Sequence, residues 1–143
     1  MCELKEENEM VLWSHLGIEP KKTNFRGIPI VTCNTVSGRI HFNAAACHMI
    51  PEVYFCKFAE ILHKKERNGG QEVLGIRLAQ DYPCAGSFRI NKVMRNQKIC
   101  GCTIYSLQLA KYIKNNRPED ILHFPVKVSE PMLFEIPLTK VIA

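Results

Sequence analysis

The chain has 143 residues, of which 46% are hydrophobic and 23% charged, with a formal net charge of +5. These values fit one globular domain with a buried core and exclude a disordered chain. Apolar runs such as residues 51–62 are interrupted by charges and fall short of the roughly 20 residues of a membrane span, so no membrane partner is expected. The acidic start of the chain is unlike a secretory signal, which predicts a cytoplasmic protein.

The first half of the chain is predicted to contain a helix and then a β-α-β-β unit. Acidic and spaced apolar residues predict an amphipathic N-terminal helix and linker over residues 1–24, ahead of one β-rich domain at 25–143. Strands are expected at 25–33 and 39–42. Asn43 is a predicted N-cap of a short helix that Pro51 ends. Residues 53–66 and 73–78 flank an Asn-Gly-Gly turn and predict a hairpin.

The second half repeats this order of elements. Residues 87–99 are expected to form a basic strand or ribbon, and residues 101–104 lead into a second helix, capped by Ser106 and ending at Lys114. Residues 121–128 and 132–138 predict a closing hairpin, in which Pro125 and Pro137 favour edge positions.

An internal repeat emerges when Gly38 is placed on Gly101. Residues 38–43 then align without a gap with residues 101–106, and each unit has a turn glycine, a strand that precedes a polar N-cap, a short helix and a hairpin. The repeats cover about residues 25–80 and 88–138. The predicted fold class is therefore α+β, mostly β, with two β-α-β-β repeats behind an N-terminal helix.

A strand opened by Gly-Arg-Ile at residues 38–40, followed by a capped helix and a hairpin, resembles the swapped-hairpin β-barrel of the AbrB and SpoVT transcription regulators. Two such units in one chain resemble the MraZ regulators. The resemblance implies a swapped-hairpin-like barrel and DNA-binding, transcription-regulating activity. It also implies that Arg39 lies beside the edge that faces DNA.

The clearest charge signal is an interval without acids. No Asp or Glu occurs between Asp81 and Glu119, while seven Lys and Arg side chains fall inside that interval. A ribbon that carries several cations can neutralise phosphates, which supplies most non-specific affinity for nucleic acid. The candidate nucleic-acid-binding residues are Arg39, Arg89, Lys92, Arg95 and Lys98. An ordinary solvated surface remains the alternative for the same cations.

Cysteine and histidine patterns give little support to a metal or an enzyme. Cys100-x-Cys102, with Cys84 and His123, lacks the paired Cys-x2-Cys spacing of a structural zinc site, and Cys100 and Cys102 could share a core face instead. We expect reduced cysteines, no metal and no cofactor. No nucleophile motif or phosphate loop occurs, so the sequence leaves enzymatic activity open and favours a non-enzymatic protein.

The function predicted from these observations is that of a DNA-binding, transcription-regulator-like protein that uses a basic β-ribbon. The alternative is a non-enzymatic oligomerisation or protein-interaction module. The candidate partners are accordingly double-stranded DNA and further copies of the chain.

Overall fold

The computed structural model describes Ser14, Leu16 and residues 27–65, 72–79 and 86–142. Apart from Ser14 and Leu16, the predicted N-terminal helix lies outside these residues, as does the predicted turn at residues 67–70. The described chain is mostly β, with ten strands and few helices, and so agrees with the predicted α+β class.

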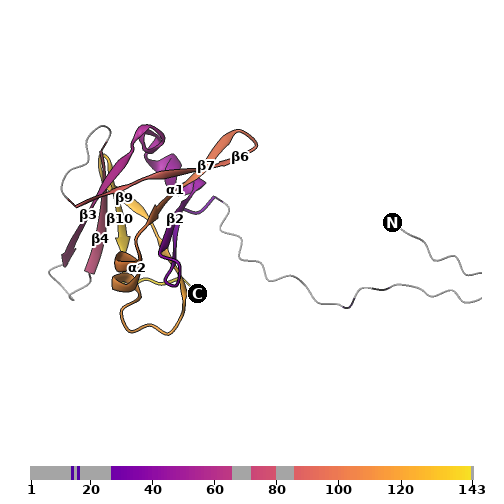
Figure 1. Ribbon diagram of the computed structural model, residues 1–143, viewed down its shortest axis with the longest axis vertical. Helices are drawn as coiled ribbons and strands as arrows, with labels where there is room; N and C mark the ends of the chain where they lie inside the picture. Colours follow the sequence, from indigo (N-terminus) through magenta and orange to yellow (C-terminus); the bar gives the residue numbers. More distant parts are fainter. Residues whose placement is uncertain (1–13, 15, 17–26, 66–71, 80–85, 143) are drawn as a thin grey trace, which may run out of the picture.

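The strands form two five-stranded antiparallel sheets (Figure 1). The first sheet has the order β6(Asn91–Arg95), β7(Lys98–Tyr105), β2(Arg39–Asn43), β1(Ile30–Asn34), β8(Ile121–Pro125). The second has the order β5(Ser87–Arg89), β3(Phe58–Lys65), β4(Glu72–Ala79), β10(Leu133–Pro137), β9(Lys127–Glu130). The remaining elements are α1(Ala44–Met49), η1(Pro51–Phe55) and α2(Leu107–Lys114).

Both predicted helix caps are confirmed. The side chain of Asn43 accepts a hydrogen bond from the backbone N–H of Ala46, and that of Ser106 accepts one from Leu109. Each bond satisfies an N–H that the first turn of a helix leaves without a partner. The two helices therefore begin where the sequence predicts.

The core lies between the two sheets. Phe42 of the first sheet and Phe134 of the second bring their ring centroids to 5.0 Å. Ile40 and Ile76 are also fully buried, in one continuous apolar cluster. Burial of one alternating set of side chains from each sheet supplies the main stabilising contribution and fixes the register of the strands.

Two predicted elements need correction. The run from Val53 does not begin a strand: Pro51–Phe55 is a 3-10 helix, which Pro51 can open without losing a needed N–H bond, and β3 starts only at Phe58. The closing hairpin is shorter than predicted, because β8 pairs with β1 and only β9 pairs with β10. Pro125 lies on an edge strand as expected, whereas Pro137 ends the interior strand β10.

The chain passes almost directly from a strand of one sheet to a strand of the other at two places. β5 and β6 are separated only by Ile90, yet they pair in different sheets, and the N–H of Ile90 donates to the carbonyl of Lys57 at 2.8 Å. β8 and β9 are separated only by Val126, whose N–H donates to the carbonyl of Pro29 at 3.3 Å. The predicted ribbon at residues 87–99 is therefore divided between the two sheets.

Candidate nucleic-acid interface

Four of the five predicted cations lie on the first sheet, and three of these fall within two cross-strand pairs. Arg95 of β6 and Lys98 of β7 are direct cross-strand partners at the end of the β6–β7 hairpin. Arg39 of β2 is paired with Tyr105 of β7. Strand β7 therefore takes part in both pairs, Arg95–Lys98 and Arg39–Tyr105.

The β6–β7 hairpin turns at Asn96 and Gln97, whose φ angles are 53° and 65°. Positive φ at both central residues is the signature of the mirror-image turn that matches the twist of two antiparallel strands. Figure 1 shows this hairpin projecting from the body formed by the two sheets. Arg95 and Lys98 flank the turn and are exposed to solvent.

Arg39, Arg95 and Lys98 share the outer face of the first sheet. Ile40 points into the core, so Arg39 points outward, because side chains alternate along a strand. Cys102 is also buried in the core, so its partner Lys92 faces inward and Arg95, three residues further along β6, faces outward. The register skips Cys100, and this bulge leaves Arg95 and Lys98 opposite one another.

The other two predicted cations are not part of this face. The ammonium of Lys92 donates a hydrogen bond to the carbonyl of Cys56, which holds β6 against the segment that follows η1. Arg89 lies on β5 in the second sheet, opposite Phe58, and is exposed. The linear run of cations in the sequence is therefore not one surface.

Charge is segregated between the two sheets. The five strands of the first sheet, all within the described residues, contain four Lys and Arg side chains and no Asp or Glu. The strands of the second sheet contain the acids Glu60, Glu72, Glu130 and Glu135 beside their own cations. The first sheet is therefore the more electropositive of the two.

A polar group that the sequence did not indicate sits beside Arg39. Nδ1 of His41 lies 3.1 Å from the hydroxyl of Thr103 and 3.5 Å from Nη2 of Arg39. Since a guanidinium can only donate, His41 accepts at Nδ1, and its neutral ring carries the proton at Nε2. Burial, and secondly the charge of Arg39, lower the pKa of His41 from its ordinary value.

The same outer face continues across β1 to β8. The hydroxyl of Thr32 lies 2.9 Å from Nδ1 of His123, and Thr32 pairs directly with both His41 and His123. Burial lowers the pKa of His123 as well. His41 could have been found from the sequence, because it lies two residues after Arg39 in a predicted strand and so shares its face. No neighbouring residue in the sequence connects His123 with Arg39.

Five of the seven cysteines lie in the part of the chain that the structure describes. Cys33, Cys47, Cys56 and Cys102 are buried, and Cys100 is partly exposed with its Sγ 3.4 Å from the carbonyl of Val93. Among the described residues no group of three or more His, Cys, Asp or Glu side chains is arranged to hold a metal ion. The bulge at Cys100 explains why it does not share the burial of Cys102.

Comparisons with family models, with curated proteins and with solved structures found no match. No helix in the described part of the chain is both long enough and apolar enough to cross a membrane.

Proposed function

We propose that this protein binds double-stranded DNA through the outer face of the first sheet and the end of the β6–β7 hairpin. The observation that carries the proposal is the combination of Arg39, Arg95 and Lys98 on one face with five strands that hold no acid. The ion pairs between described residues involve none of these three cations. Cations that are not neutralised by a carboxylate can bind phosphate and release its counterions.

The shape of the hairpin supports a duplex as the ligand. The major groove of B-DNA is about 12 Å wide and admits a two-stranded β-ribbon. The β6–β7 hairpin is such a ribbon, and its exposed end carries Arg95 and Lys98. Arg39 and His41 lie further back on the same face, where they would contact the DNA backbone. A role in transcription regulation would follow from the resemblance to the swapped-hairpin regulators.

Closure of the two sheets into one barrel is part of the same proposal. Each sheet ends at a strand that continues into the other sheet, through Ile90 on one side and Val126 on the other. If these two chain connections are counted with the strand pairings, the order of neighbours returns to the strand from which it started. A closed barrel leaves no long free edge, which suits a protein that presents one face and one ribbon.

Duplication of a β-α-β-β unit is part of the proposal and is supported by the two capped helices. Asn43 caps α1 and Ser106 caps α2, and these helices follow the two paired strands β2 and β7. The ungapped alignment of Gly38 with Gly101 makes buried Phe42 equivalent to exposed Tyr105. Because a two-fold axis between antiparallel strands keeps equivalent side chains on the same face, such an axis requires a shift of one residue in the alignment of β2 with β7.

The experiment is a salt titration of binding to a fluorescent duplex. Replacement of Arg39, Arg95 and Lys98 by Ala should lower the slope of log affinity against log salt by roughly 2.7, since each phosphate contact contributes about 0.9. The matched control removes three exposed cations of the second sheet, Lys65, Arg77 and Lys127, and should leave the slope unchanged. Equal slopes for both triple variants would contradict the assignment to the first sheet.

Replacement of Lys92 tests whether this lysine binds DNA or stabilises the fold. Because its ammonium bonds to the carbonyl of Cys56, Lys92→Ala should lower stability and change the salt slope less than Lys98→Ala does. A full unit of slope lost from Lys92→Ala would mean that this lysine leaves the carbonyl to contact phosphate.

A second candidate function, self-association, is favoured by an exposed apolar group. Val36, Tyr105, Leu107 and Ile121 are between 45% and 68% exposed, and all four lie near the end of the first sheet where the β1–β2 turn packs against α2. Gathered apolar side chains at a surface are typical of protein interfaces. Light scattering that finds a stable dimer, together with no affinity for any duplex at low salt, would favour this function over DNA binding.

A further inference from the structure

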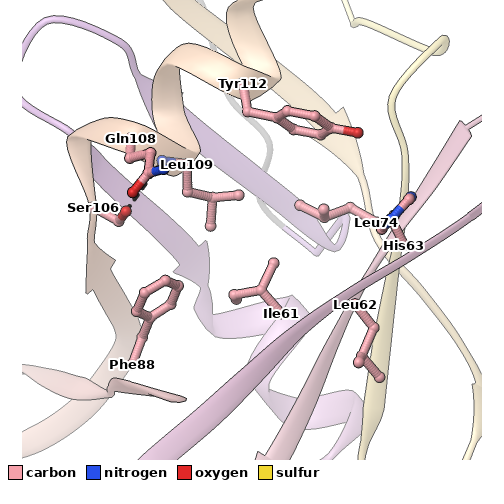
Figure 2. A pocket seen from close by; sticks show the side chains of 9 residues that line it. All are labelled: Ile61, Leu62, His63, Leu74, Phe88, Ser106, Gln108, Leu109 and Tyr112. Carbon is pink, nitrogen blue, oxygen red and sulfur yellow. Dashed lines mark hydrogen bonds between the residues drawn. The ribbon is translucent and has the colours of Figure 1, made fainter. Parts of the chain in front are cut away.

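A cavity of about 340 Å³ lies between α2 and the second sheet (Figure 2). Ile61 of β3 and Phe88 of β5 line it on the side of the sheet, and Leu109 and Tyr112 line it on the side of the helix. Its volume falls in the range of small-molecule sites, about 300–1,000 Å³. It is distinct from the outer face of the first sheet.

The floor of this cavity is the protein core. Leu74 and Leu109 belong to the buried apolar cluster, and Ile61 and Phe88 pack against that cluster. The cavity is thus a place where solvent reaches the edge of the core. Apolar surface that remains open to water favours an apolar ligand that would cover it.

The polar groups around the cavity are few and carry no fixed charge. Ser106, Gln108 and His63 line it, and none of its lining residues is Lys, Arg, Asp or Glu. Burying an ion without an opposite charge is costly, so the lining selects against charged ligands. An amide and a hydroxyl can each exchange hydrogen bonds with a neutral polar group.

Contacts at the rim join the two walls. The hydroxyl of Tyr112 donates to Oε2 of Glu72, and Nδ1 of His63 lies 3.4 Å from the same oxygen. This connection between α2 and the β3–β4 hairpin holds the walls apart at a defined width. Figure 2 shows the rings of Phe88 and Tyr112 at opposite sides of the space, so aromatic surfaces bound it at both ends.

We propose that this cavity binds an uncharged, planar aromatic molecule that carries one polar group. The aromatic part would contact Phe88, Ile61 and Tyr112, where stacked or edge-to-face ring contacts are available. The polar group would meet Gln108 or Ser106 at the start of α2. The site is independent of the proposed DNA-binding face, so either can fail without the other.

The test uses indole as the probe with the full chain. Indole should bind with a Kd of about 1 mM or tighter and should shift the amide resonances of α2, β3 and β5 in a heteronuclear NMR titration. Indole-3-acetate and tryptamine have the same ring with a negative or a positive charge, and each should bind at least about tenfold more weakly. Equal binding of all three compounds, or shifts confined to other elements, would overturn the proposal.

A variant that fills the cavity gives the second arm. Ile61→Trp should weaken indole binding at least about tenfold, whereas Val36→Trp adds the same side chain at an exposed turn and should leave binding unchanged. If Ile61→Trp does not fold by circular dichroism, Gln108→Trp at the exposed start of α2 fills the cavity from its rim. Indole binding that survives in the folded filling variant would place the ligand elsewhere and refute the site.

Discussion

Replacement of Gly38 by Ala tests how closely the β1–β2 turn packs against the start of α2. Gly38 has a φ of +81°, and a Cβ added there would lie 2.8 Å from the backbone nitrogen of Leu107 and 2.9 Å from its Cα. The carbonyl of Gly38 also accepts the N–H of Ser106 at 2.9 Å. The two backbones therefore cannot separate to admit a methyl group without losing this bond.

Two terms determine the expected cost of Gly38→Ala. The left-handed backbone conformation costs an L-residue about 1–2 kcal/mol, and forcing a methyl group into a packed site costs about 1–3 kcal/mol. The sum is about 2–5 kcal/mol, a large part of the roughly 5–15 kcal/mol by which domains are stable. Urea denaturation followed by circular dichroism measures it as a lower midpoint with an unchanged m-value.

Gly86 provides the matched control for this prediction. Its φ is +84°, but no atom lies within 4 Å of an added Cβ, so Gly86→Ala carries the conformational term without the steric one. It should cost about 1–2 kcal/mol. If Gly38→Ala and Gly86→Ala destabilise the protein equally, the close approach of the turn to α2 is wrong.

Three further measurements test the caps, the histidine and the thiols. Asn43→Ala should cost about 2–3 kcal/mol and Ser106→Ala about 1 kcal/mol in urea denaturation, because Asn43 makes two further hydrogen bonds to the start of the domain. Because the pKa of His41 is lowered in the folded protein, the unfolded chain binds a proton first as the pH falls. The free energy of unfolding should therefore decrease on acidification below about pH 6.5. Between pH 7 and pH 5, the His41→Gln variant should lose less of this free energy than the unchanged protein does. Alkylation of the folded protein at pH 8 should modify Cys100 before Cys33, because burial raises the pKa of Cys33 to about 11. After denaturation without reductant, mass spectrometry should find all seven cysteines alkylated, and a smaller number would indicate a disulfide.

The parts of the fold that sequence could predict are those that depend on local chemistry. A polar side chain can cap a helix only from a fixed distance, so Asn43 and Ser106 identified both helix starts. The β3–β4 hairpin followed from two β-rich runs around a turn. The 3-10 helix at Pro51–Phe55 was missed because an apolar run of that length is compatible with either a strand or a short helix.

Local sequence patterns could not predict which strands pair when the strands are distant in the sequence. Whether β8 pairs with β10 or with β1 depends on how a strand bends at Val126, which the side chains of residues 121–128 do not specify. The inward position of Lys92 depends in the same way on its pairing with Cys102 and on a carbonyl 36 residues away. Long-range register, not residue type, decides which lysines and arginines share a face.

The charge pattern shows what register adds to composition. In sequence, the acid-free stretch between Asp81 and Glu119 suggests that Arg89 belongs with Arg95. The change of sheet at Ile90 instead puts Arg89 in the second sheet, whose strands contain acids. The acid-free surface is completed instead by β1, β2 and β8, which lie outside this stretch of the sequence. Each of these strands has only five residues, so the absence of acids from any one of them is not a signal that sequence reasoning could use. A polyanion responds to the potential of a whole face, because charges within roughly 10 Å act together at 0.1 M salt. The proposed DNA binding therefore depends more on the pairing of Arg39 with β7 than on the number of cations in the interval.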